Sequence, residues 1–166
     1  SAQSKDSIRA DYERDGYCIF RSVLDDALLQ EAKSHVDWLM AKNPGRRPEQ
    51  FDCDLITNDP FWVRLVGDAR LLDLAQQFIG QNIALYASHY IAKRPFDGKA
   101  VLWHQDGTYW PLEPMEVVSL FLAIDDADAE NGCLRVIPGS QSSRLLDLSE
   151  LQTRTDIDNV LGTAMD

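Results

Sequence analysis

Hydrophobic residues in the first 80 positions recur three or four apart, which places them on one face of a helix. The clearest stripe consists of Leu28, Ala32, Val36 and Leu39. It follows the pair Asp25 and Asp26, whose side chains are suited to cap the start of a helix. Similar patterns over residues 4–15 and 68–79 each end at a glycine, the usual residue after a helix. The sequence therefore predicts a helical N-terminal region.

The pattern changes at Gly80 to short segments rich in aromatic and β-branched residues. These predicted strands cover residues 83–92, 100–105, 117–124 and 133–137. Gly, Pro and Asn turns separate them, and no helical pattern lies between them. Short strands in this order predict an antiparallel barrel or jelly roll. We expect an α+β fold with a mainly β core after the helical N-terminal region.

The length of 166 residues suits one domain, with roughly 70 % of the unfolded surface buried on folding. We assign residues 1–166 to that domain and divide it into three parts. Residues 1–80 form the helical support, and residues 81–140 contain the strands. Residues 141–166 are polar and acidic with little periodicity, so we predict a loop there.

The balance of acidic and basic residues disfavours some classes of binding partner. Lys and Arg number 16 against 27 Asp and Glu, a formal charge of −11, which repels nucleic acid and anionic membrane surfaces. The cysteines are Cys18, Cys53 and Cys133. Their wide spacing and odd number argue against a disulfide framework or a zinc site and predict a reducing, cytoplasmic location. A small-molecule partner remains the expectation.

His104 and Asp106 are the strongest candidates for chemistry. They lie two apart on a predicted strand, so both side chains project to one face, about 6–7 Å apart along the backbone. One imidazole and one carboxylate on one face suit non-haem iron, which takes two imidazoles and one carboxylate and keeps open positions. The alternative is a surface histidine hydrogen-bonded to an aspartate at the end of a strand.

Several further motifs accompany this pair in a recurrent order. They are DGY at 15–17, KRPFDG at 93–98, WHQDGTYWP at 103–111, AIDD at 123–126 and NGCLRVIPGS at 131–140. Together they resemble the phytanoyl-CoA dioxygenase family of iron(II)- and 2-oxoglutarate-dependent oxygenases. The resemblance implies a cupin-like double-stranded β-helix with helices packed on it. It also implies His104 and Asp106 as iron ligands, with 2-oxoglutarate and O2 as co-substrates.

The chain departs from the family pattern after the strands. The family carries a distal histidine ligand and then an arginine that holds 2-oxoglutarate, but no histidine follows His104 in this sequence. Four of about eight barrel strands are recognisable, so we expect an incomplete barrel, with residues 141–166 leading to strands outside this sequence. We interpret the sequence as part of a longer protein. A degenerate relative that has lost the metal is the alternative.

Further candidate residues lie around the predicted iron site, and the resemblance implies two of them, His89 and Phe121. His89 and Phe121 would contact 2-oxoglutarate, and Lys93 would offer charge to an anionic ligand. Tyr109 and Trp110 would line the substrate pocket. The structural alternatives are a hydrogen-bonded core position for His89, barrel packing for the aromatic residues and a solvated strand end for Lys93.

The function implied is hydroxylation of a small organic substrate, with 2-oxoglutarate converted to succinate and CO2. A metal-dependent hydrolase or isomerase on a cupin-like barrel is less favoured because such sites use more histidines. A non-catalytic binding module on the same fold is the third interpretation, and the missing distal ligand supports it. We expect little or no turnover from these 166 residues alone.

Overall fold

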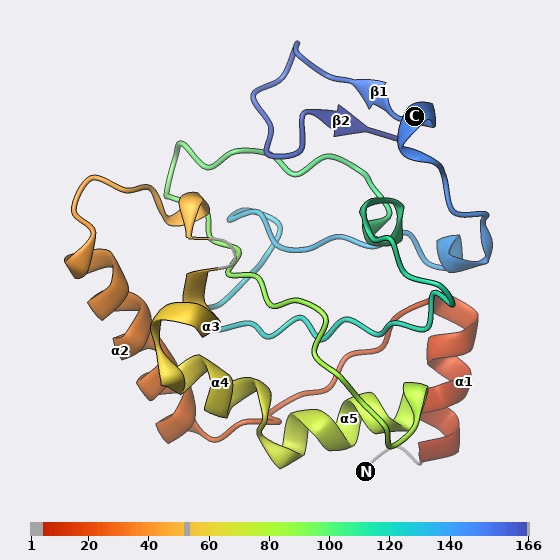
Figure 1. Cartoon of the computed structure of the whole chain (residues 1–166), viewed down its shortest axis with the longest axis horizontal. Helices are drawn as coiled ribbons and strands as arrows, with labels where there is room; N and C mark the ends of the chain where they lie inside the picture. Colours follow the sequence, from red (N-terminus) through yellow and green to blue (C-terminus); the bar gives the residue numbers. More distant parts are fainter. Residues whose placement is uncertain (1–4, 52–53, 166) are drawn as a thin grey trace.

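The computed structural model describes residues 5–51 and 54–165. Its helices are α1 (Lys5–Asp15), α2 (Asp26–Lys42), α3 (Asp54–Asn58), α4 (Pro60–Val66) and α5 (Ala69–Ile79). Single 3-10 turns span Pro48–Gln50, Asp106–Tyr109, Ser140–Ser142 and Leu148–Glu150. The strands are β1 (Gln152–Thr153) and β2 (Thr163–Ala164). Figure 1 shows the helices gathered along one side of the molecule, with extended chain beyond them and the β1–β2 hairpin at the far end.

The helices predicted from the hydrophobic stripe are confirmed, because their start signals are local. Asp25 caps α2 by accepting a hydrogen bond from the Leu28 amide at 2.8 Å. Asp68 caps α5 in the same way, and Gly80 ends that helix with a φ of 82°. The predicted starting position at residue 4 lies outside the described residues, so α1 is described from Lys5.

The hydrophobic core lies between α2, α3 and α4. Its buried members are Leu28, Ala32, Leu39, Phe51, Leu55, Phe61, Trp62 and Leu65. Phe51 has no exposed surface. Two extended segments cover this core with the half-buried side chains of Tyr90, Leu122 and Ile124. The helices therefore support the segments that were predicted to be strands.

The prediction of four hydrogen-bonded strands is wrong for this structure. The segments 83–92, 117–124 and 133–137 run as extended chain without a ladder, as does the short segment 17–20 predicted to be a strand. In 100–105 the only pairing among the described residues is an isolated parallel bridge between Ala100 and Asn159. Strand propensity reflects how side chains fit a pleated surface, whereas a strand also needs a neighbour at hydrogen-bonding distance. The described sheet has two strands.

The predicted loop at 141–166 is more ordered than its composition suggested. It folds into two 3-10 turns and the antiparallel hairpin, with Gln152 opposite Ala164 and Thr153 opposite Thr163. Ala164 is 3 % exposed, so the hairpin contributes a buried position. The periodicity missed this hairpin because each strand is only two residues long.

The structure tests part of what the sequence predicted about the cysteines and about membrane-spanning segments. Cys18 and Cys133 are free thiols, and Cys53 lies outside the described residues. None of the helices in the described chain combines the length and the apolar character needed to cross a bilayer.

The ion pair between Asp68 and Arg70 can be tested through the pH dependence of stability. Its hydrogen bonds to Arg70 lower the pKa of its carboxyl to about 2, below the usual value of about 3.9. When folding lowers the pKa of a carboxyl, the ionised carboxylate stabilises the folded protein at pH values above the pKa of the unfolded chain. This contribution is lost as the pH falls through the pKa of the folded protein. Asp68→Asn keeps the cap but removes the charge. We expect it to be less stable than wild type at pH 7 in urea unfolding.

The stability difference between Asp68→Asn and wild type should shrink from pH 4 downward and vanish near pH 2. A difference that stays constant over this range would contradict the assigned ion pair. Asp73→Asn, in the middle of α5, provides a control at a carboxylate outside the cap.

Candidate metal centre

The segment that carries His104 and Asp106 is held in place by main-chain hydrogen bonds. The amide of Val160 donates to the carbonyl of Ala100 at 2.9 Å, and that of Met165 donates to the carbonyl of Trp103 at 2.9 Å. At Asp106 the extended chain turns into the 3-10 turn. His104 therefore lies on the last extended residues before a tight bend.

His104 and Asp106 point toward one another. The Nε2 atom of His104 lies 3.1 Å from Oδ1 of Asp106. On the other side of the ring, Nδ1 donates to the carbonyl of Leu102 at 2.7 Å. This second bond places a proton on Nδ1 and turns Nε2 toward the carboxylate, the arrangement typical of metal-binding histidines.

The hydrogen bond between the two side chains favours their charged forms. It raises the pKa of the His104 imidazole, and desolvation opposes this rise only in part. The same bond lowers the pKa of the Asp106 carboxyl, with a smaller contribution from the charge of His89. Each side chain thus stabilises the charged form of the other. A divalent ion would take the place of the shared proton.

The separation of these atoms fits one metal ion. Two ligands about 2.1 Å from an ion and at a right angle to one another lie about 3.0 Å apart. The 3.1 Å between Nε2 of His104 and Oδ1 of Asp106 matches that value. Within residues 5–51 and 54–165, no three His, Cys, Asp or Glu side chains meet closely enough to form a metal site. His104 and Asp106, two of the predicted ligands, thus lie side by side, and their binding of a metal stays a prediction.

Gln105 points away from this pair and holds a second segment. Its Nε2 donates to the carbonyl of Arg144 at 3.1 Å, and its Oε1 accepts from the amide of Leu146 at 2.9 Å. The hydroxyl of Thr108 donates to the Leu146 carbonyl at 2.9 Å. The side-chain amide of Gln105 thus makes the two hydrogen bonds that the peptide group of a neighbouring strand would make in a sheet. These bonds fix the backbone between the two ligands.

Tyr109 and Trp110, predicted to line a substrate pocket, lie on different sides of the motif. The Tyr109 ring meets the His104 ring edge to face, with centroids 6.3 Å apart. Trp110 lines a hollow of about 360 Å³ together with Gln105, Met115 and Leu145. Only Tyr109 is therefore placed directly beside a candidate ligand, and the substrate role of both residues stays a prediction.

His89 and Phe121 project from the face opposite the helices. Tyr90 and Leu122 pack on the helical core, and successive side chains of an extended chain alternate. His89 and Phe121 therefore face the other way, and a positive charge on His89 would lower the pKa of the Asp106 carboxyl. Phe121 is 52 % exposed. The structure brings His89 near the metal motif, and contact with 2-oxoglutarate stays a prediction for both residues.

Lys93 lies in the turn region that ends the first extended segment. Its side chain is so close to Gly98 and Gly132 that a Cβ on either glycine would approach it within about 3 Å. This contact packs Lys93 over two turns. These contacts do not test the prediction that Lys93 offers positive charge to an anionic ligand.

Thr163 is a site neighbour that the sequence analysis did not find. Its Oγ1 lies 2.9 Å from the hydroxyl of Tyr109, although the two residues are 54 positions apart. No local motif signals such a contact, because it depends on the hairpin returning to the metal motif.

A comparison with models of known protein families identifies the family of this chain. The family model described as phytanoyl-CoA dioxygenase (PhyH) matches residues 12–157, most of the chain. The chain belongs to the phytanoyl-CoA dioxygenase family. The match includes the segments that place His104, Asp106 and Tyr109, so the predicted resemblance is confirmed.

Several relatives of this chain carry the names of dioxygenases or hydroxylases. It is 28 % identical to an ectoine dioxygenase of Sphingopyxis alaskensis over 85 % of this chain and 51 % of the relative. It is 32 % identical to a probable alpha-ketoglutarate-dependent hypophosphite dioxygenase of Stutzerimonas stutzeri over 54 % of this chain and 31 % of the relative. It is 34 % identical to the L-proline trans-4-hydroxylase of Streptomyces griseoviridis over 54 % of this chain and 35 % of the relative.

These matches cover the relatives only in part. The chain spans about half the length of the ectoine dioxygenase and about a third of the other two. No solved structure gives a significant match.

Proposed function

We propose that the protein is an iron(II)- and 2-oxoglutarate-dependent dioxygenase that hydroxylates a small organic substrate. The observation that carries the proposal is the 3.1 Å between His104 Nε2 and Asp106 Oδ1, with Nδ1 turned to the Leu102 carbonyl. The names of the relatives support 2-oxoglutarate as co-substrate and a small molecule as the substrate class. Bound iron would supply O2 activation.

The chain's own residues would bind and orient the reacting groups. His104 and Asp106 would hold two neighbouring positions of the ion. His89 and Phe121, on the face opposite the helices, would contact 2-oxoglutarate, and Lys93 would add positive charge for an anionic group. Tyr109 and Trp110 would shape the substrate side and limit the access of water.

We further propose that the extended segments become strands of a double-stranded β-helix in a longer protein. Apolar side chains on these segments are strongly exposed: Leu85, Ile91, Phe121, Leu134 and Ile137 are each more than half exposed. Partner strands would bury this surface and satisfy the unpaired main chain. The third ligand and the arginine for 2-oxoglutarate would come from that additional chain, so the 166 residues alone should show little or no turnover.

The proposal predicts a direct spectroscopic result. Protein of the length of its relatives, titrated anaerobically with iron(II) and 2-oxoglutarate, should develop a weak visible charge-transfer band. Admission of O2 should then yield succinate. Absence of both would favour the rival function, a binding module without catalysis. That rival has one observation in its favour, since the described residues supply two ligands rather than three.

Gln105 provides a second test, because it fixes the backbone between the ligands. Gln105→Ala removes both bonds to residues 144 and 146 without changing the side chains of His104 and Asp106. Groups that orient metal ligands typically change affinity by about 10- to 100-fold. We expect iron(II) binding to weaken by about 10-fold in an anaerobic titration.

Gln77→Ala is the matched control for Gln105→Ala. Its side chain donates to the carbonyl of Asp73 within α5, far from the candidate site in the sequence. It should bind iron(II) like wild type. Equal affinity in the two variants would contradict the assigned role of Gln105.

A further inference from the structure

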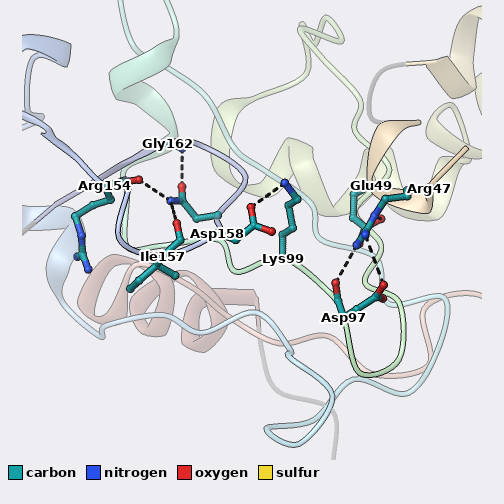
Figure 2. A network of polar contacts seen from close by, with 9 residues as sticks. Arg47, Glu49, Asp97, Lys99, Arg154, Ile157, Asp158 and Gly162 are labelled. Atoms are coloured by element: carbon teal, nitrogen blue, oxygen red, sulfur yellow. Dashed lines mark hydrogen bonds and ion pairs between the residues drawn. The ribbon is translucent and has the colours of Figure 1, made fainter.

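The tip of the β1–β2 hairpin is a small polar structure with its own organising residue. Asn159 donates through Nδ2 to the carbonyls of Arg154 at 3.0 Å and Ile157 at 2.8 Å. Its Oδ1 accepts from the amide of Gly162 at 2.5 Å. In Figure 2, dashed lines join Arg154, Ile157 and Gly162 to one side chain that lies among them. One side chain thus defines the course of residues 154–162.

The loop is fastened to the segment that leads into the metal motif. Lys99 and Asp158 form an ion pair at 2.8 Å, which Figure 2 shows beside the loop. The Ala100–Asn159 bridge and the bond from the Met165 amide to the Trp103 carbonyl add main-chain contacts on either side. Trp103 immediately precedes His104 in the sequence. The hairpin and the candidate ligand are therefore attached to the same stretch of backbone.

Thr163 connects this hairpin to the metal motif through side chains. Its hydroxyl lies 2.9 Å from that of Tyr109, and both residues are half-buried. The Tyr109 ring meets the His104 ring at an angle of 65°, within the range of favourable edge-to-face contacts. Thr163 holds the far end of Tyr109, and Tyr109 in turn supports one side of the imidazole.

We propose that Thr163 is a positioning residue of the metal centre, acting through Tyr109 on the orientation of His104, with residues 154–162 serving to hold it there. The proposal rests on the proposed function only for the identity of the ion. Three groups then surround the imidazole. Leu102 fixes its Nδ1, Asp106 faces its Nε2, and Tyr109 restrains the plane of the ring.

Thr163→Val tests the hydrogen bond with little change of shape. It removes the hydroxyl and leaves Tyr109 free to rotate, and Tyr109→Phe removes the same bond from the other side. Thr163→Ser keeps the hydroxyl and is the conservative rescue. Because the two residues act through one bond, the double variant Tyr109→Phe with Thr163→Val should be no worse than either single variant.

The first measurement follows the imidazoles of the metal-free protein by ¹H–¹⁵N NMR, with the His104 signals assigned by their loss in His104→Ala. We expect Thr163→Val and Tyr109→Phe to shift the His104 signals and Thr163→Ser to restore them. The His35 signals should stay in place, because that ring is stacked on Phe61 in the helical core and reports on the integrity of the fold. Unmoved His104 signals in a folded Thr163→Val protein would overturn the proposal.

The second measurement is the dissociation constant for iron(II), measured anaerobically on protein of the length of its relatives. Each single variant should bind about 10-fold more weakly, the double variant equally so, and Thr163→Ser within about 2-fold of wild type. Additive losses, or no loss in Thr163→Val, would overturn the positioning role. If wild type binds no iron(II), the proposed function fails, while the NMR result still decides whether Thr163 positions His104.

Discussion

Replacing His104 with alanine is expected to abolish specific iron(II) binding. The imidazole is one of the two proposed ligands, whose Nε2 and Oδ1 atoms lie 3.1 Å apart. Loss of an orienting neighbour alone costs about 10- to 100-fold in metal affinity, so loss of a ligand should exceed about 100-fold. Anaerobic titration with iron(II) and 2-oxoglutarate measures this loss, and the visible band should be absent from the variant.

His35→Ala is the matched control for His104→Ala. His35 also pairs with an aspartate, Asp59, at 2.5 Å, but it belongs to α2 and packs on Phe61. Its removal should leave iron(II) affinity unchanged. If His104→Ala bound iron(II) as wild type does, or if His35→Ala lost the metal, the ligand assignment would be wrong.

Replacing Phe51 with alanine is expected to cause a large loss of stability. Its ring has no exposed surface, lies among the buried residues of the helical core and is covered on one face by the Arg46 guanidinium, 4.3 Å from the ring centroid. Truncating such a residue leaves a cavity and costs about 3–5 kcal/mol. Urea unfolding measures this free energy, which is a large share of the stability of a typical domain.

Phe96 offers a control at the opposite extreme. It lies fully exposed in the turn after the first extended segment. Phe96→Ala should change the free energy of unfolding by no more than about 0.5 kcal/mol. A loss below about 1 kcal/mol for Phe51→Ala would show that the core does not centre on Phe51.

The N-terminal helices could be predicted because their signals are local. Asp25 and Asp68 cap the helices whose apolar stripes they precede, and Gly80 stands where α5 ends. The five-residue helix α3 had no comparable stripe or cap in the sequence pattern. Local hydrogen bonding and periodicity thus carry most of the information about the first half of the chain.

The extended half was predicted less well for a physical reason. Alternation correctly separated the two faces, since Tyr90 and Leu122 pack on the helices while Phe121 is exposed. Pairing was not predictable, because a ladder requires a partner strand that the alternation of one segment does not specify. The hairpin at 152–164 was missed for the opposite reason, as its strands are too short to show a pattern.

The residues of the candidate site also divide into those that the sequence predicted and those that it could not predict. The spacing of His104 and Asp106 predicted two side chains on one face, and the structure brings their atoms within metal-sharing distance. The family resemblance added His89, whose charge acts on Asp106. Thr163 could not be predicted, because its contact with Tyr109 forms only when distant segments meet.

The most direct test of the metal centre is a crystal structure of the full-length protein grown anaerobically with iron(II), with anomalous scattering recorded at the iron edge. The account predicts a single strong peak bonded to both Nε2 of His104 and a carboxylate oxygen of Asp106, each at about 2.0–2.2 Å. A peak bonded to neither residue, or an imidazole and carboxylate turned away from one another around an empty space, would contradict it.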